Sequence, residues 1–378
     1  MKTIGIIAEY NPFHAGHDYH IRKSREAVGE DAAVIAVMSG DYVQRGEPAL
    51  FSKFARAEAA CWSGADLVVE LPLSATLASA EGFAEGAAAL LTAMGADYLS
   101  FGSETGDLQK LQALADLTRG PEFIDSVRAE LKSHPEQSFA AARQRTAENM
   151  AGRPLPELRQ PNNILGIAYL NAIRNTAIRP VAIRRIGARH DQTGPDSVPS
   201  AKELRLRFGS GESLEPFLPS SAFRVLNGQP TPDLCSYKLL LLDRLRQRER
   251  AAFPADNLGD RMYSGVRASG SLEEFQLRSA SRRYPLSRVR RECLRTALNL
   301  RPGNPAFIRV LALNQRGRQL LRREPSVPFL VRPARVRALS AEAEAQFTAA
   351  ADAHDLFCLM CGEETVGEDW RRSPAICL

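Results

Sequence analysis

The sequence predicts an α/β fold in which a doubly wound parallel sheet is followed by a mostly helical C-terminal domain. Two observations lead to this prediction. In the first hundred residues, short apolar runs alternate with helix-like segments of ten or more residues, and this alternation is typical of parallel βαβ units. From about residue 216 onward the apolar runs give way to long arginine-rich segments with helical periodicity.

The expected strands and helices follow one another in regular order. Each strand is a short apolar run bounded by glycine, proline or polar residues, and each helix repeats apolar residues at intervals of three or four. We expect strands at residues 3–10, 32–40, 65–72, 96–104 and 180–187, and helices at residues 16–29, 51–64, 79–95 and 161–173.

This order of elements divides the chain into three expected regions. Residues 1–215 form the α/β domain, which carries a helical insertion at about 107–160. Residues 216–345 form the basic helical domain, and residues 346–378, rich in alanine and acid, form a short C-terminal appendix.

Three of the expected strands end in polar or glycine-bearing loops. Their sequences are NPFHAGH, SGDYVQRGEP and FGSE. Ligands of open α/β sheets sit at the carboxyl ends of the strands, so we expect the three loops to line one crevice.

Composition excludes several classes of protein. The apolar runs are shorter than the roughly 18 residues that suggest a membrane span, and an acid and a proline interrupt the N-terminus where a secretory signal would stay apolar. The six cysteines are too few and too scattered for a disulfide framework. We therefore expect a cytoplasmic protein with reduced thiols and no membrane partner, while its oligomeric state is left open.

The first loop concentrates histidine, because His14, His17 and His20 are half of the chain's six. His14 and His17 are three residues apart, on one face of the first turn of the expected helix. Free backbone N–H groups at such a turn bind anions, and Gly16 leaves room for a phosphate. Ordinary surface or core histidines, or two ligands of a metal, are the alternatives, although no third ligand is evident nearby.

A second motif, PSAKELR, supports phosphate binding. Ser200 is expected to cap the helix that follows, and Arg205 lies one turn further along it. A hydroxyl, free N–H groups and a guanidinium would then meet opposite the histidines. Simple helix capping is the alternative.

The two motifs together resemble the HIGH-type nucleotidylyltransferase superfamily, in which an H-x-G-H loop and a later serine–arginine motif bind ATP. The chain also resembles the bacterial tRNA(Met) cytidine acetate ligase family over most of residues 1–320. The motifs that carry this second resemblance are GIIAEYNPFHAGH, MSGDYVQRGEPA, GADLVVELP, FGSE, QPNNILGIAYL, RRIGARHD, PSAKELR, RRYPLSRVRRECL and AFIRVLALNQRG.

This resemblance implies a Rossmann-like sheet of the nucleotidylyltransferase type and an ATP-dependent ligase. Such an enzyme activates acetate as acetyl-adenylate, without acetyl-CoA, and then acetylates the wobble cytidine of elongator tRNA(Met), forming N(4)-acetylcytidine. The resemblance assigns phosphate handling to His14, His17, Ser200 and Arg205. It assigns ATP binding to Ile7, Ala8, Glu9, Tyr10, Asn11, Pro12, Phe13, His14, Ala15, Gly16, His17, Asp18, Tyr19, His20, Gly102, Asn162, Arg185 and Ile186.

The remaining ligands are less sharply indicated. Mg²⁺ is expected on the phosphates of ATP, but the sequence contains neither a P-loop nor a dedicated metal site. Gln44, Arg45 and Lys53 are candidates for an acetate pocket. Alternatively, they order their loop and pair with Glu47 or Glu58.

The expected helical domain contains a one-sided basic tract. Six arginines and no acid lie between residues 278 and 291, which favours a surface that follows RNA phosphates. The tyrosine within the tract has an aromatic ring suited to stacking on a base. The candidate tRNA-binding residues are Arg282, Arg283, Tyr284, Arg288, Arg290 and Arg291.

Two further points stay open at this level. Cys358 and Cys361 in CLMC resemble half of a zinc site, with His354 and Cys377 as the only nearby partners. Two other functions also fit parts of the sequence. One is a nucleotidylyltransferase that acts on a small molecule, and the other is a non-catalytic RNA-binding protein with a retired ATP site.

Overall fold

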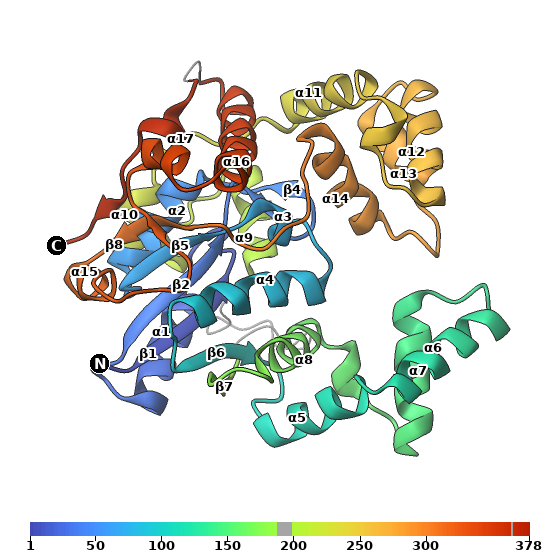
Figure 1. The fold of residues 1–378 in the computed structure, drawn as a ribbon, viewed down its shortest axis with the longest axis horizontal. Helices are drawn as coiled ribbons and strands as arrows, with labels where there is room; N and C mark the ends of the chain where they lie inside the picture. Colours follow the sequence, from blue (N-terminus) through green and yellow to red (C-terminus); the bar gives the residue numbers. More distant parts are fainter. Residues whose placement is uncertain (187–198, 364–365) are drawn as a thin grey trace.

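The computed structural model describes residues 1–186, 199–363 and 366–378 (Figure 1). Five parallel strands form most of the sheet in the order β5-β2-β1-β6-β7, which confirms the doubly wound arrangement. All five overlap the predicted strands: β1 (Thr3–Ala8), β2 (Ala33–Ser39), β5 (Leu67–Leu71), β6 (Tyr98–Ser103) and β7 (Arg179–Arg184).

The sheet separates two apolar cores. Successive residues of a strand point to opposite faces. Accordingly, Val34 and Ala36 of β2 join one core, while Ile35 and Val37 join the other. The first core is covered by α1 (Ala15–Val28), α2 (Lys53–Trp62), α9 (Ala201–Gly209) and α10 (Ser220–Leu226); the second by α4 (Ala80–Ala93), α5 (Leu108–Leu117) and α8 (Pro161–Ile173).

The sheet is mixed, whereas the sequence predicts a wholly parallel one. β8 (Ile308–Leu313) pairs antiparallel with β5, and β9 (Phe329–Leu330) and β10 (Ala375–Ile376) pair parallel with β8. The edge of β5 is thereby covered, as an exposed edge strand would otherwise invite pairing with another chain. The segment that contains β8 was expected to be helical, so the sequence reading missed a completely buried strand.

The insertion between β6 and α8 is helical, as expected. Its distal helices lie beside one another, away from the sheet (Figure 1). Besides α5, it consists of α6 (Pro121–Ser133), α7 (Phe139–Ala151) and the 3-10 turn Pro156–Arg159.

Four helices beyond α10 surround an apolar core of their own (Figure 1). Leu356 and Phe357 of α16 (Ala341–Met360) close this core, so α16 joins the helical unit to the C-terminal end. Strand β10 then returns to the sheet. The four helices are α11 (Leu234–Arg246), α12 (Asn257–Arg267), α13 (Leu272–Ser279) and α14 (Leu286–Ala297).

The remaining elements are short. None of the helices in the described part of the chain has the length and apolar character needed to cross a membrane. The short elements are β3 (Tyr42–Val43), β4 (Glu47–Pro48), α3 (Leu73–Thr76), α15 (Gln315–Leu320), α17 (Glu368–Arg371) and the 3-10 turns Glu215–Phe217, Arg250–Ala252 and Pro333–Ala338.

Gly317 on α15 offers a test of how the C-terminal segment seals the sheet. A Cβ atom there would lie 2.1 Å from the backbone oxygen of Asp66. Gly317→Ala should therefore lower the free energy of unfolding by about 1–3 kcal/mol, measured by urea denaturation. Gly120→Ala is the control, because nothing lies within 4 Å of its added Cβ. Equal stability of the two variants would contradict this packing.

Candidate active site

A cavity of about 410 Å³ opens at the carboxyl ends of β1, β6 and β7. It lies where strand order reverses around β1, which is where open α/β sheets bind ligands. Most of the residues predicted for the site line it: Ile7, Ala8, Glu9, Tyr10, Asn11, His14, Gly16, His17, Tyr19, His20, Gly102, Asn162, Arg185, Ile186 and Ser200.

His14 and His17 are oriented by the backbone of their own turn. The Nδ1 atom of His14 accepts a hydrogen bond from Gly16 N at 3.0 Å, and Nδ1 of His17 accepts one from His14 N at 3.2 Å. Because Nδ1 accepts in both rings, the proton of each neutral ring sits on Nε2. The capping turn thus prepares two N–H donors for an anion.

Both histidines are neutral at pH 7. Burial lowers the pKa of His14 to about 4, and the charge of Arg185 adds to the effect. Burial, together with His14, Arg185 and His20, also lowers the pKa of His17 well below its usual value. Each ring therefore donates a hydrogen bond without carrying a charge of its own.

The other members of the first loop divide into two groups. Tyr19 and His20 line the cavity, and Nε2 of His20 lies 3.0 Å from Ser100 Oγ. Pro12, Phe13, Ala15 and Asp18 are outside its lining. Phe13 is 0% exposed and packs on Tyr10 and His17, so its contribution is to hold the loop's shape.

Hydrogen bonds join two polar side chains of the opposite wall, Asn162 and Arg185, to each other and to Glu104, which lies outside the lining. Asn162 donates to Glu104 Oε1 through its backbone N, at 3.2 Å, and through Nδ2, at 2.6 Å. Arg185 Nη1 donates to Asn162 Oδ1 at 3.4 Å. Gly102 lies beside this guanidinium stem, since a Cβ there would be 3.2 Å from Arg185 Cγ. The sequence reading missed Glu104, although it is the acid of the FGSE motif.

The start of the motif PSAKELR lines the cavity, with Pro199, Ser200 and Ala201. Ser200 caps α9 by accepting a hydrogen bond from Glu203 N at 3.2 Å, and it also lines the cavity. Arg205 instead donates to the backbone oxygen of Asn11 at 2.7 Å, so it contacts the outer side of the histidine loop. Residues 187–198, which include the end of RRIGARHD and most of the loop before Ser200, lie outside the described residues.

Two of the three acetate candidates line the cavity, and one does not. Gln44 and Arg45 are in the lining. The prediction for Lys53 is wrong because its ammonium is fully buried, 3.0 Å from Glu70 Oε1 and paired with Asp369. Desolvating the charge requires such partners, so Lys53 ties the sheet to the C-terminal segment.

Apolar side chains that the sequence reading did not single out complete the wall. Phe83, Phe101 and Tyr169 lie beside the polar groups. Such a surface suits a flat aromatic ligand group, while the histidine turn suits its anionic end.

The arginine tract is less exposed and less one-sided than its sequence suggests. Tyr284 is 5% exposed, so the expectation that its ring stacks on a base is wrong; it packs in the core of the helical unit. Arg288 pairs with Asp256 at 2.7 Å, and Arg290 pairs with Glu47 of β4. These contacts depend on which face of each helix is buried and on which distant acids lie beside it. A count of charges along the sequence does not reveal them.

Three arginines of the tract form no ion pair among the described residues: Arg282, Arg283 and Arg291. Arg282 and Arg283 are exposed and Arg291 is half-buried. Helix α14 packs against the β3–β4 turn, since a Cβ added to Gly46 would lie 2.6 Å from Arg291 N. Arg45, which precedes this glycine, lines the cavity.

Comparison with known proteins agrees with this geometry. A family model described as HIGH Nucleotidyl Transferase matches residues 1–368. The sheet and the H-x-G-H turn define the same class of protein. A tRNA(Met) cytidine acetate ligase from Syntrophotalea carbinolica is 38% identical over 88% of this chain and 86% of its own length. One from Acetivibrio thermocellus is 34% identical over 88% of each chain. The chain therefore belongs to the tRNA(Met) cytidine acetate ligase family, as its motifs suggest.

Solved structures share the whole architecture. Thermotoga maritima TmcAL bound with alpha-thio ATP matches with a TM-score of 0.87 and 29% identity, over 100% of this chain and 99% of that chain. An apo form of the same T. maritima protein gives the same values.

The pKa of His14 predicts how acid affects stability. Its folded pKa of about 4 lies below the ordinary value of 6.5, so the unfolded chain binds the proton more readily. Above pH 6.5 the residue has no effect; below it, stability falls until about pH 4. Between pH 7 and 5 this single group removes about 2 kcal/mol.

The variant His14→Asn isolates this contribution. Asparagine keeps an acceptor for Gly16 N at the helix cap but does not titrate. Urea denaturation at pH 7 and pH 5 should show a smaller loss of stability in the variant than in the wild type. An equal loss would contradict a buried neutral His14.

Proposed function

We propose that this chain is an ATP-dependent tRNA(Met) cytidine acetate ligase. It activates acetate as acetyl-adenylate and then acetylates the wobble cytidine of elongator tRNA(Met) to N(4)-acetylcytidine. The observation that carries the proposal is the pair of neutral histidines with protonated Nε2 atoms at the first turn of α1, inside the cavity. The names of its relatives supply the substrates, and the T. maritima neighbour holds an ATP analogue.

In the first step an acetate oxygen attacks the α-phosphorus of ATP, and the bond from that phosphorus to the bridging oxygen breaks. Pyrophosphate leaves with the electron pair of this bond. Such a displacement needs positioning and charge stabilisation rather than a covalent enzyme intermediate. We assign hydrogen bonding of the phosphates to His14, His17 and Ser200, and charge compensation to Arg185. Arg205 would hold the histidine loop through Asn11 and add its positive charge from behind that loop.

In the second step the exocyclic amine of cytidine attacks the acetyl carbonyl carbon. The carbon–oxygen bond to AMP breaks, AMP leaves, and the nitrogen loses a proton. Gln44 and Arg45 line the cavity and offer an amide and a guanidinium for a small carboxylate, so we propose them as acetate-binding residues.

Mg²⁺ is proposed as a companion of the ATP phosphates. The ion prefers oxygen ligands, and Glu9 is the single carboxylate among the described residues that line the cavity. This lining fits an ion held mainly by phosphate oxygens, with charge neutralisation as its chemical contribution.

We propose Arg282, Arg283 and Arg291 as the principal phosphate contacts for tRNA. None of the three has an acidic partner in the described structure. Arg282 and Arg283 precede α14, whereas Arg291 lies on it, next to the β3–β4 turn that contains Gly46. Arg288 and Arg290 remain candidates that would first exchange their carboxylate partners for RNA phosphates. A tRNA substrate also implies a cytoplasmic location.

The defining experiment combines labelled acetate, ATP and elongator tRNA(Met). Label should enter the tRNA and vanish when ATP is omitted. If exchange between ATP and pyrophosphate did not require acetate, and no label entered the tRNA, the results would instead favour a nucleotidylyltransferase that acts on a small molecule.

His17→Ala should slow acetate-dependent ATP–pyrophosphate exchange by 100-fold or more, because it removes one preorganised donor to the developing charge. His134→Ala, at the end of α6 outside the cavity, should leave the rate unchanged. Normal exchange in His17→Ala would exclude this residue from the activation step, whereas a wild-type protein without exchange would favour an ATP site that has lost its activity.

The double variant Arg282→Ala, Arg283→Ala should weaken tRNA binding and reduce its dependence on salt, because fewer counterions are released. Acetate-dependent ATP–pyrophosphate exchange should stay at the wild-type rate. Arg128→Ala on α6, whose side chain pairs with Asp125, is the matched control. Unchanged acetylation kinetics in the double variant would refute this RNA surface.

A further inference from the structure

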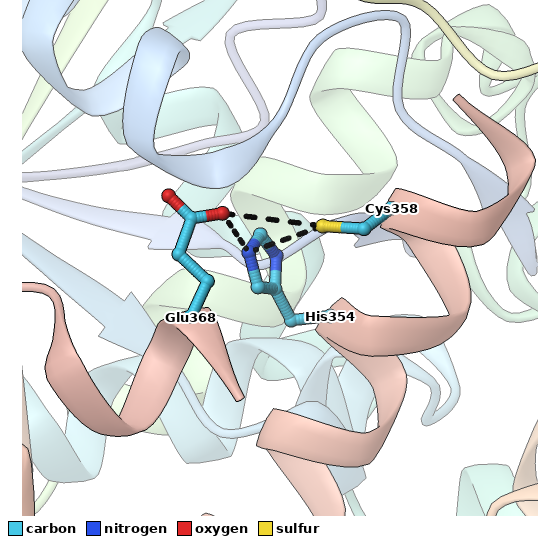
Figure 2. A group of neighbouring side chains, drawn as sticks. All are labelled: His354, Cys358 and Glu368. Carbon is cyan, nitrogen blue, oxygen red and sulfur yellow. Dashed lines mark hydrogen bonds and ion pairs between the residues drawn. The ribbon is translucent and has the colours of Figure 1, made fainter. Parts of the chain in front are cut away.

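We propose that His354, Cys358 and Glu368 form a zinc-binding site on the C-terminal segment. Figure 2 shows the imidazole, the sulfur and a carboxylate oxygen turned toward one common point. These ligand atoms lie within 4.8 Å of one another. The cluster is separate from the nucleotide cavity, since none of its members lines that cavity.

Distances between the ligand atoms fit a tetrahedral site. His354 Nε2 is 3.5 Å from Cys358 Sγ and 3.1 Å from Glu368 Oε2, and the sulfur and the carboxylate oxygen are 4.0 Å apart. Usual zinc bond lengths and tetrahedral angles give separations of about 3.3–3.6 Å between such ligands. Binding requires shifts of only a few tenths of an ångström.

Local structure explains how the three residues meet. His354 and Cys358 are four residues apart on α16 and therefore share a face. Glu368 is the first residue of α17, which approaches that face (Figure 2). Gly367, with φ of 73°, makes the turn before it, and its N–H is held by Asp355 Oδ1 at 2.9 Å.

A carboxylate beneath the histidine selects the tautomer that a metal needs. His354 Nδ1 lies 2.9 Å from Asp41 Oδ2, which is buried after β2. If Nδ1 carries the proton and donates it there, the lone pair of Nε2 faces the cluster. This arrangement of carboxylate, histidine and metal recurs in zinc proteins, where the carboxylate orients the ring.

The exposure of the cluster and the chemical type of its ligand atoms also favour zinc. His354 and Cys358 are 0% and 1% exposed, whereas the side chain of Glu368 is 27% exposed, so the ion can enter from the carboxylate side. One sulfur, one nitrogen and one oxygen suit zinc better than magnesium or calcium. Water would supply a fourth ligand.

Without an ion, the cluster has a different charge arrangement. Burial lowers the pKa of His354, but the charge and hydrogen bond of Asp41 and the hydrogen bonds of Cys358 and Glu368 raise it to about 12, so His354 then sits as an imidazolium. Lys53 and Arg372 neutralise the neighbouring carboxylates. Zinc ligation requires a free lone pair on His354 Nε2 and a thiolate at Cys358. The ion's two charges would then be balanced by thiolate and carboxylate.

The expected consequence is a fixed C-terminal segment. Zinc would join α16 to α17 and, through Asp41, hold both against the loop after β2. That loop brings Gln44 and Arg45 to the nucleotide cavity, so the ion would stabilise one wall of the active site from behind.

Metal analysis of the purified full-length chain tests the proposal. After dialysis, mass spectrometry should find one zinc per chain. Cobalt added to chelator-treated wild-type protein should produce the intense near-ultraviolet band of a thiolate–cobalt bond. Absence of both signals in the wild type would overturn the site, whatever the variants do.

Variants identify the ligands. Cys358→Ser should abolish the thiolate band and weaken zinc binding by at least tenfold, and Asp41→Asn should weaken it by about 10–100-fold. Cys361→Ser is the matched control at the same end of α16. Cys377→Ser is a second control, because this thiol contacts Cys61 and lies outside the cluster. Both variants should bind zinc like the wild type. Equal zinc affinity and an unchanged cobalt band in Cys358→Ser would refute the assignment.

Discussion

One buried guanidinium holds together the strand ends that form the active site. Arg56 of α2 is 0% exposed and donates to the backbone oxygens of Phe51, at 2.9 Å, Glu9, at 2.5 Å, and Ser39, at 3.3 Å. Buried backbone carbonyl groups beyond the ends of the strands have no partner in the sheet, so they need hydrogen-bond donors from elsewhere. A guanidinium offers five N–H donors. Glu9 leads into the histidine turn and Ser39 into the loop of Gln44, so the site's geometry depends on this residue.

The same region concentrates buried charge, which must be matched pair by pair. Burial raises the pKa of Glu9, while Gln44 N and the nearby guanidiniums oppose that shift. Burial also lowers the pKa of Arg56 to about 10. Removing one partner of such a set leaves an uncompensated charge, which costs far more than breaking a surface pair. The described loops that carry these groups are therefore held by electrostatic as well as packing contacts.

The C-terminal segment is an integral part of this arrangement. Asp369 of α17 reaches Lys53 and lies 3.3 Å from Arg309 of β8, while His354 of α16 reaches Asp41. The contacts with Lys53 and Asp41 span more than 300 residues of sequence, and they tie α17 to α2 and α16 to the loop after β2. A segment that composition describes as a short appendix thus helps to define the site.

By itself, the sequence determined the five parallel strands, the helices between them and the histidine turn. Hydrophobic periodicity and the H-x-G-H spacing act over a few residues, so they can be read along the chain. Only the tertiary structure decided that Ile308–Leu313 completes the sheet, that Tyr284 is buried and that Lys53 pairs with Asp369. Each of these depends on which distant residue covers a strand, a ring or a charge, and local pattern carries no information about such contacts.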